Sequence, residues 1–452
     1  MEILPGKKAV SENLNVTLPK VLIIGQPFNN DTGGGVTISN LFKGWDSEKL
    51  AVLCFTQQLS FNIDASLCKR YYQLGHKERA WVFPFNLLAK KHHSGPVTIN
   101  NRIKNISGNS KISYRSKILN NYILPFARYI GLYPLTIKTR LSNELVSWIN
   151  DYNPDIIYAQ GSSRSDILFC TAITKLFQKP IIFHVMDDWP SLYNEKGIFK
   201  KYWHRRTEKE FKNLLDQSCL LLTICDEMSD EYLRRYNKPS IAFHNAVDLR
   251  LWQPYARQSY DLADQPTILY AGRTGLGINS SLESIARAID EINKENKLSI
   301  KFILQTQNLP QWVSKYRCLE KKSYVSYADI PKVFSSADIL ILPYDFSSTS
   351  KKYIRYSMPT KAPEYMASGT PIIILSPECT ALAKYAIKYK WALTITKNEV
   401  AVIKREIKEF ISNKTLRETM SHNAIGLAKK NHDLTKVSMQ FKDTLTAIVN
   451  NH

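Results

Sequence analysis

The chain has 452 residues, of which 44% are hydrophobic and 22% are charged. This length exceeds what one compact core normally holds and predicts two domains. The composition is that of a globular protein, so it excludes a largely disordered chain. No run of about 18 apolar residues occurs, which argues against a transmembrane helix.

The net charge is +21, and it is unevenly distributed along the chain. Residues 65–140 contain fourteen Lys or Arg and one acid, Glu78. Such a field attracts polyanions, which include nucleic acid, an anionic bilayer surface and a phosphorylated substrate. A basic solvated face without a partner is the plainer alternative.

The seven cysteines are irregularly spaced and include no CxxC pair, so neither a disulfide framework nor a zinc site is predicted. Residues 1–19 are interpreted as a loose tail that lacks the apolar segment of a signal peptide. We therefore expect a cytoplasmic protein that, where it meets a membrane, lies on its inner face.

The first half of the chain begins with a strand, a glycine-containing loop and a helix. An apolar run at 20–25 predicts a buried strand, and the apolar spacing at 36–45 predicts a helix after the loop QPFNNDTGGG. A strand is predicted at 51–55, and parts of the basic, aromatic-rich stretch 60–125 are interpreted as helices resting against an interface. From residue 141 strands alternate with helices, which predicts a parallel sheet. The strands are expected at 155–159, 180–184 and 219–224, and the helices at 141–151, 166–177, 202–216 and 229–236.

A linker-like stretch at 245–265 separates this series from a second one. Its strands are expected at 267–272, 299–305, 337–342 and 371–375, and its helices at 281–293, 330–336, 363–368 and further on to 452. We therefore predict an α/β protein with a tail at 1–19, a first domain at 20–250 and a second at 251–434. The last helix, about 435–452, is expected to pack back on the first domain.

Three consecutive glycines, Gly33–Gly35, lie between a predicted strand and a predicted helix. They let the backbone approach a bound group, and the helix N-terminus offers unpaired N–H groups. A simple turn is the alternative. The spacing differs from the dinucleotide fingerprint and from the P-loop, so neither kind of site is predicted.

His184 falls at the C-terminal end of a predicted strand, the sheet edge at which open α/β proteins bind ligands. It could orient a hydroxyl or carry a proton, and a buried structural histidine is the alternative. Asp187 and Asp188 follow it. Helix capping or a hydrogen bond to His184 is favoured over a metal site, because no further ligand is apparent.

The second series carries features suited to a diphosphate. Arg273 lies in a glycine-bearing loop directly after a strand, where a guanidinium can bind phosphate oxygens in pairs. Ser357–Thr360 is a turn entering a helix, whose N–H groups together with Lys361 could hold an anion. Glu364, one turn further on, could accept both hydroxyls of a ribose, although it also simply favours a first helical turn.

Taken together, these segments resemble the retaining glycosyltransferases of the GT-B fold, especially the glycosyltransferase family 4 group that builds bacterial surface polysaccharides. The resemblance spans residues 20–386 and rests on segments in family order: IIGQPFNNDTGGG, FHVMDDW, ICDEMSDEYLRRYNK, FHNAVDLRLW, LYAGRTGLGI, ADILILPY and PTKAPEYMASGTPI. It implies two facing Rossmann-like domains with a nucleotide-diphosphate sugar, and no other cofactor, in the cleft between them.

The resemblance also implies roles for single residues. Gly34 and Gly35 would face the donor diphosphate, and His184 would contact the transferred sugar. Arg273 would bind the diphosphate and Glu364 the ribose. Two positions depart from the family pattern: no lysine follows shortly after Arg273, where Lys361 is the expected substitute, and Tyr356 stands at the first of two glutamates normally eight apart.

The implied reaction needs no metal, because fixed positive groups stabilise the leaving diphosphate. If the reaction retains configuration, the departing phosphate serves as base. If it inverts, His184 or Asp31 is the candidate base. The first domain would bind a glycan or lipid-diphosphate-linked acceptor, with the basic region 65–140 against an anionic membrane.

Three alternatives remain open. A sugar-nucleotide epimerase on the same fold would bind the same donor without an acceptor. A non-catalytic partner subunit would keep the fold without the chemistry. Nucleic acid is not expected as a partner, because no recognised binding module accompanies the basic stretch.

Overall fold

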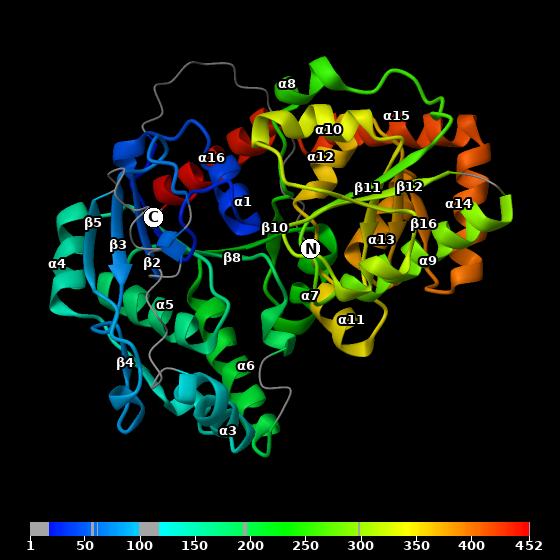
Figure 1. The fold of residues 1–452 in the computed structure, drawn as a ribbon. Helices are drawn as coiled ribbons and strands as arrows, with labels where there is room; N and C mark the ends of the chain where they lie inside the picture. Colours follow the sequence, from blue (N-terminus) through cyan, green and yellow to red (C-terminus); the bar gives the residue numbers. More distant parts are fainter. Residues whose placement is uncertain are drawn as a thin grey trace, which may run out of the picture.

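The computed structural model describes residues 18–55, 58–60, 62–98, 117–192, 197–296 and 299–451. Within these ranges the chain forms two α/β domains, each built on a largely parallel sheet with helices on both faces (Figure 1). No helix in the described part of the chain combines the length and the apolar character needed to cross a membrane.

The first domain contains an eight-stranded sheet. Its strands are β1 (Val21–Ile24), β2 (Leu50–Phe55), β3 (Arg70–Leu74), β5 (Gly95–Thr98), β7 (Ile156–Ala159), β8 (Ile181–Val185), β9 (Leu220–Thr223) and β10 (Ser240–Ala242). They run in the order β10-β9-β8-β7-β1-β2-β3-β5, and each pair is parallel except β3 with β5. The central strands are unbroken apolar runs because both of their faces are covered.

Helices cover the two faces of this sheet. They are α1 (Gly33–Leu41), α4 (Asn143–Tyr152), α5 (Arg164–Phe177), α6 (Lys200–Gln217) and α7 (Asp226–Tyr236), and the short helix α3 (Leu124–Tyr129) lies away from the sheet (Figure 1). The apolar side chains of α4, α5, α6 and α7 pack on one face, and those of α1 pack on the other. A small two-stranded sheet, β4 (Arg79–Trp81) with β6 (Ile137–Thr139), extends from the domain near α3 (Figure 1).

The second domain contains a six-stranded, fully parallel sheet in the order β13-β12-β11-β14-β15-β16. Its strands are β11 (Thr267–Ala271), β12 (Lys301–Gln305), β13 (Leu319–Lys322), β14 (Ile339–Pro343), β15 (Ile372–Leu375) and β16 (Leu393–Ile395). Its helices are α9 (Asn279–Asn296), α10 (Ile330–Ser336), α11 (Ser348–Ile354), α12 (Lys361–Ser368), α13 (Ala381–Tyr389), α14 (Val400–Ser412) and α15 (Lys414–Asn431), and α8 (Leu249–Trp252) precedes the sheet.

The chain passes between the domains twice. After β10 it enters the second domain, and α16 (Leu434–Asn450) returns to pack beside α1 (Figure 1). The two crossings are tied by backbone hydrogen bonds, because Val247 donates to the His432 carbonyl and accepts from Leu434 N. The Phe441 ring of α16 lies 5.0 Å from that of Phe42, in an edge-to-face contact.

The predicted alternation of strands and helices is confirmed from residue 141 onward, although strands β10, β13 and β16 were not predicted. Two expectations in the first domain were wrong. The glycines form the first turn of α1 rather than a loop, because the Thr32 side chain caps the helix by accepting from Gly35 N. The stretch 60–125 supplies strands β3, β4 and β5 as well as α3. Strand β3 lies between β2 and β5, and the exposed Arg70 and the buried Gln73 interrupt its sequence, so it lacks the apolar run of β1 or β7.

Candidate functional site

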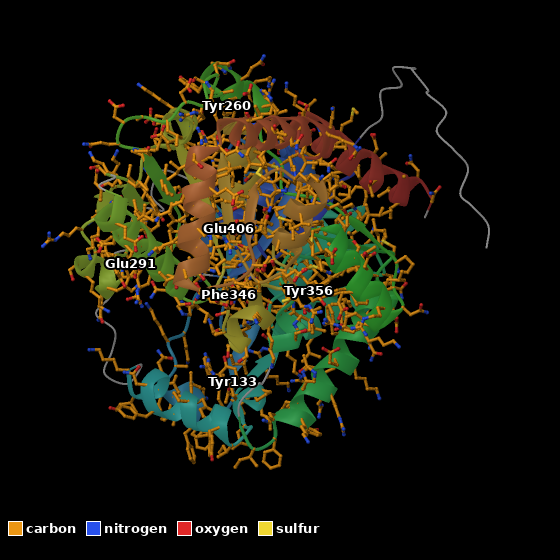
Figure 2. All side chains as sticks on the ribbon, turned by 90° about the vertical axis from the view of Figure 1, so that its right-hand side faces the viewer. Tyr133, Tyr260, Glu291, Phe346, Tyr356 and Glu406 are labelled. Atoms are coloured by element: carbon orange, nitrogen blue, oxygen red, sulfur yellow. The ribbon has the colours of Figure 1, made fainter. Side chains whose placement is uncertain are left out.

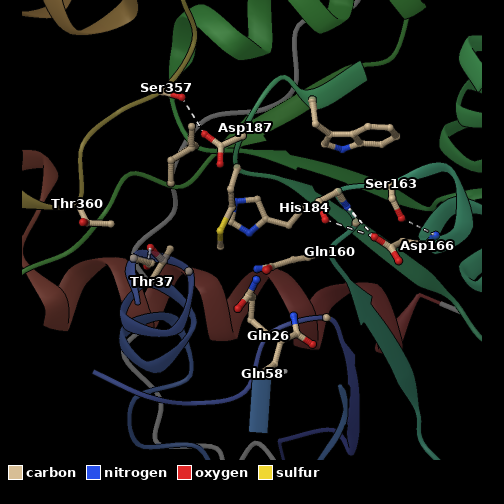
Figure 3. Close-up of a pocket in the computed structure, with 18 of the residues that line it drawn as sticks. Gln26, Thr37, Gln58, Gln160, Ser163, Asp166, His184, Asp187, Ser357 and Thr360 are labelled. Atoms are coloured by element: carbon tan, nitrogen blue, oxygen red, sulfur yellow. Dashed lines mark hydrogen bonds between the residues drawn. The ribbon is translucent and has the colours of Figure 1, made fainter. Parts of the chain in front are cut away.

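A cavity of about 720 Å³ lies between the two domains and is lined by both. The first domain contributes residues at the C-terminal ends of β1, β7 and β8, and the second contributes residues after β11 and before α12. This is the edge of each sheet at which open α/β folds bind ligands. Figure 3 shows Gln26 and Gln160 below the His184 ring, with Asp187, Ser357 and Thr360 on the other side.

The glycines at the start of α1 have two different surroundings. Gly33 and Gly34 line the cavity, and a Cβ added to Gly33 would lie 3.3 Å from Cγ2 of Thr360 in the other domain. A Cβ on Gly35 would lie 2.3 Å from the buried Asn29 side chain. Gly34 thus lies at the cavity, whereas Gly35 is outside its lining and packs against Asn29.

His184 is 1% exposed and lines the cavity. Its Nδ1 lies 2.6 Å from the Tyr158 hydroxyl, which accepts a hydrogen bond from Gln160 Nε2 at 2.8 Å. Burial lowers the pKa of His184 to about 3, with the backbone of Thr223 opposing the shift in part. The imidazole is therefore neutral at physiological pH.

The side chains of the two aspartates after β8 have different partners. Neither of them forms a hydrogen bond with His184, contrary to the expectation from the sequence that they would. The Asp188 carboxylate is 3% exposed and accepts from Arg235 and from the Tyr232 hydroxyl. Asp187 lines the cavity, where its Oδ1 accepts from the Ser357 hydroxyl at 2.8 Å. This hydrogen bond joins the two domains across the cavity (Figure 3).

On the second-domain side, Arg273, Ser357 and Thr360 line the cavity. One Arg273 nitrogen donates to the Leu276 carbonyl at 3.3 Å, and a guanidinium has five N–H donors, so this hydrogen bond uses one of them. Thr360 directly precedes α12, so the N-terminal end of that helix lies at the cavity. Within its first turn Ala362 N donates to the Pro359 carbonyl, and Pro363 has no N–H.

Lys361 and Glu364 lie outside the lining formed by the described residues. The Lys361 ammonium is 5.6 Å from the centre of the Phe334 ring. Glu364 is 8% exposed, and burial raises its pKa, with Lys361 and the Tyr327 hydroxyl opposing the shift. Asp31 is also outside, and its Oδ2 accepts from Asn62 N at 2.8 Å.

Tyr356, the residue that replaces the expected glutamate, is 7% exposed and packs at the domain boundary (Figure 2). Its carbonyl accepts a weak hydrogen bond from Cys225 Sγ of the first domain at 3.4 Å. Burial, followed by the charge of Glu231, raises the pKa of Tyr356. Tyr356 therefore contacts the first domain through its backbone carbonyl and is not part of the cavity lining.

The outer part of the first-domain lining was not predicted from the sequence. Arg79 pairs with Asp166, whose other oxygen accepts from Ser162 N at 3.0 Å. The Arg79 guanidinium also stacks 3.6 Å from the centre of the Phe55 ring. Gln58 lies beside them with a neutral amide. The position of Asp166 could have indicated a site residue, because it lies in the first turn of a helix that follows a strand. Arg79 could not be found in this way, because it lies in the stretch 60–125, whose strands were not predicted.

Metal ligation has no support in the described ranges, where no group of three or more His, Cys, Asp or Glu side chains is arranged to hold an ion. The cavity lining combines the guanidiniums of Arg79 and Arg273 and two helix N-termini with amides, hydroxyls and the carboxylates of Asp166 and Asp187, which are hydrogen-bonded to Arg79 and Ser357. Such a lining suits a ligand that is anionic at one end and rich in hydroxyls at the other.

Comparisons with known proteins agree with this architecture. Residues 265–413 match the family model of the glycosyl transferases group 1, and no curated protein matches the sequence. Sucrose-phosphate synthase from Thermosynechococcus elongatus is similar in structure, with a TM-score of 0.63 and 12% identity over 96% of this chain and 100% of that one.

Two further structures are similar over nearly their whole length. Anabaena HepE in complex with UDP-glucose has a TM-score of 0.56 and 12% identity, covering 95% of this chain and 100% of that one. A glycosyltransferase from Rickettsia africae has a TM-score of 0.56 and 14% identity, covering 96% and 100%. The chain therefore has the GT-B fold of glycosyltransferases, and its second domain matches the glycosyl transferases group 1 family.

Proposed function

We propose that the protein is a glycosyltransferase that moves a hexosyl group from a nucleotide-diphosphate sugar to a glycan or lipid-diphosphate-linked acceptor. The observation that carries this proposal is the cavity between the domains, with Arg273 and the N-termini of α1 and α12 on its walls. Structures with the same fold are described as complexes with UDP-glucose and with UDP-2-fluoro glucose. We infer a donor of this class here.

In the proposed reaction, negative charge develops on the diphosphate as the glycosidic bond breaks. Arg273 and the helix N-termini stabilise that charge in place of a metal ion. A neutral His184 with a pKa of about 3 is a poor base, and Asp31 lies outside the cavity. The two carboxylates that line the cavity already have partners, Asp166 in Arg79 and Asp187 in Ser357. We therefore infer retention of configuration, in which the departing phosphate takes the acceptor proton.

We further propose that the first domain meets an anionic membrane on its cytoplasmic side, where a lipid-linked acceptor for cell-surface polysaccharide synthesis would be presented. Its support is an exposed apolar face, here called the α3 face, around α3, its flanking turns and the start of α6 (Figure 2). Its apolar members, all at least 46% exposed, are Phe83, Leu87, Tyr122, Phe126, Tyr129, Leu132, Leu135, Ile198, Phe199 and Tyr202.

The parts of the α3 face are joined by direct contacts. Ile198 N donates to the Tyr129 carbonyl at 2.9 Å, and Trp203 Nε1 donates to the Gly131 carbonyl at 2.6 Å. Exposed basic side chains surround it: Lys117, Arg128, Lys138, Lys200, Lys201, Arg205, Arg206 and Lys209. Each Lys or Arg near an anionic bilayer contributes about 1 kcal/mol, so the charge and the apolar groups act together.

Vesicle sedimentation tests the α3 face. The wild-type protein should bind vesicles containing anionic lipid better than neutral ones, and Phe126→Ser with Tyr129→Ser should reduce that binding. Ile387→Ser, at a 48% exposed position of the second domain, is the matched control and should bind like wild type. Equal binding to anionic and neutral vesicles would refute the membrane part of the proposal.

Product analysis tests the transferase itself. Candidate sugar nucleotides are incubated with and without lipid-diphosphate-linked sugars, and the products are separated and their anomeric configuration is determined by NMR. Transfer to the lipid with the donor configuration kept supports the proposal. An epimerised donor formed without acceptor identifies an epimerase instead.

The buried Tyr356 favours a second candidate function, that of a non-catalytic partner subunit. Tyr356 replaces a glutamate that, in the family that this sequence resembles, helps to position the sugar. Donor binding without any product would support that candidate.

A further inference from the structure

Tyr158, Gln160 and His184 form a hydrogen-bonded chain at the ends of two adjacent strands. Parallel pairing of β7 with β8 places Tyr158 opposite Ile182. Because side chains alternate along a strand, Tyr158 and His184 share one face of the sheet. Their rings meet edge to face at 5.8 Å between centroids.

The hydrogen bonds favour one placement of the protons. The Tyr158 hydroxyl accepts from Gln160 Nε2, which leaves its own single proton available for Nδ1 of His184 at 2.6 Å. A neutral imidazole whose Nδ1 accepts must carry its proton on Nε2. Tyr158 is fully buried, and burial raises its pKa, which keeps that phenol protonated.

The other ring nitrogen of His184 is in different surroundings from Nδ1. Nε2 is buried without a hydrogen bond to any described residue, although buried polar atoms are nearly always paired. Since His184 lines the cavity, an acceptor atom of a bound molecule would satisfy it. Asp187 and Arg273 are charged groups that share this lining, and neither forms a hydrogen bond with the imidazole.

We propose that Tyr158 and Gln160 are positioning residues that hold His184 as the neutral tautomer with its proton on Nε2. In that state His184 donates a hydrogen bond to an oxygen of the cavity occupant and cannot take a proton from the acceptor. We assign that oxygen to the transferred sugar, and this assignment rests on the proposed function. The tautomer of His184 does not depend on the proposed function.

Nitrogen NMR of histidine-labelled protein tests the tautomer directly, with the His184 signals assigned from a His184→Gln spectrum. In the wild type we expect a protonated Nε2, an unprotonated Nδ1 and no titration between pH 5 and 8. A protonated Nδ1, or a charged ring at pH 7, would overturn the proposal.

Two variants test the chain. Tyr158→Phe removes the proton donor, so we expect mixed tautomers and an upward shift of the His184 pKa. Gln160→Glu replaces a donor with an acceptor for the Tyr158 proton, so Tyr158 then accepts from His184 and the tautomer should reverse. Tyr71→Phe, at another buried tyrosine of the same core cluster, should leave the His184 signals unchanged. Unchanged signals in both site variants would also overturn the proposal.

Kinetics then link the tautomer to the reaction. Tyr158→Phe should lower turnover about tenfold, the equivalent of one hydrogen bond, while the affinity for the nucleoside diphosphate stays unchanged. Wild-type turnover in a variant whose tautomer has reversed would overturn the role of the Nε2 proton. If no glycosyl transfer is found at all, the NMR result still decides the tautomer.

Discussion

The side chains around the start of α1 show how closely placed residues divide structural and binding roles. The Asn29 side chain accepts from Asp31 N, Thr32 N and the Thr32 hydroxyl, so it cannot move without breaking the turn. Gly35 packs against this fixed group, whereas Gly34 faces the flexible Gln26 side chain and the cavity.

Gly35→Ala and Gly34→Ala should therefore affect different properties, the first the stability of the protein and the second its ligand binding. The first forces a Cβ into a fully buried amide and should cost about 1–3 kcal/mol of unfolding free energy. The second meets the Gln26 side chain at 3.1 Å, which can give way, and should mainly weaken diphosphate binding. Urea unfolding and calorimetric titration measure the two effects. Equal stability of the two variants would contradict the placement of Gly35.

At the scale of elements, α16 joins the second domain to the first through an aromatic cluster. Phe441 lies within 5.8 Å, between ring centroids, of Phe42, Tyr158 and Phe243. Since Tyr158 also contacts His184, the same cluster supports the floor of the cavity.

Phe441→Ala should destabilise the protein by about 3–5 kcal/mol, because it leaves a cavity in this fully buried cluster. Met439→Ala, at a 56% exposed position of the same helix, is the control and should change stability by about 0.5 kcal/mol or less. Denaturant unfolding of both variants provides the comparison. A Phe441→Ala protein as stable as the control would show that α16 is not needed to hold the domains.

The elements that could be predicted from the sequence are those with strong local patterns. The apolar runs of β1, β7 and β8 and the amphipathic helices between them were identified because burial on both faces leaves only apolar residues. The edge strand β13 reads LEKK because most of its side chains are exposed, and the strand β3 reads RYYQL, in which Arg70 and Gln73 interrupt the apolar pattern. Their pairing depends on neighbours far away in the sequence.

The candidate site divides in the same way. His184 and Arg273 were identified because each directly follows or ends a strand, and Ser357 and Thr360 because they enter a helix. The partner of His184 could not be predicted, since Tyr158 reaches it only through the pairing of β7 with β8. The contact of Asp187 with Ser357 depends on how two domains meet, and no local pattern encodes that.

At the scale of the whole molecule, two buried histidines lie where the domains are joined. His432 stands at the return crossing, where its Nδ1 contacts the Asn245 carbonyl at 2.8 Å. Burial, followed by the charge of His244, lowers its pKa to about 3, and burial lowers that of His184 to about 3.

Both histidines make stability depend on pH. In the unfolded chain they titrate near 6.5, so between pH 6.5 and 3 the unfolded state binds more protons than the folded one. Their contribution is complete above pH 6.5 and is lost as the pH falls toward 3. Thermal unfolding at pH 7.5, 6 and 5 should show a falling Tm, with a weaker fall in His432→Gln than in wild type. His93→Gln, at an exposed position, should follow wild type, and an identical slope in all three would contradict this account.

The central claim is that the cavity between the domains binds a nucleotide-diphosphate sugar through Arg273 without metal. Its most direct test is thermal unfolding in metal-free buffer with UDP, GDP, CDP and ADP and their sugar conjugates. At about 100 times its Kd a ligand stabilises the folded state by about 2.7 kcal/mol, so one nucleotide family should raise the Tm by several degrees. Arg273→Ala should reduce that shift, and Arg287→Ala, on an exposed helix face, should keep it. No shift with any diphosphate in the folded wild-type protein, or the same shift in Arg273→Ala, would contradict the claim.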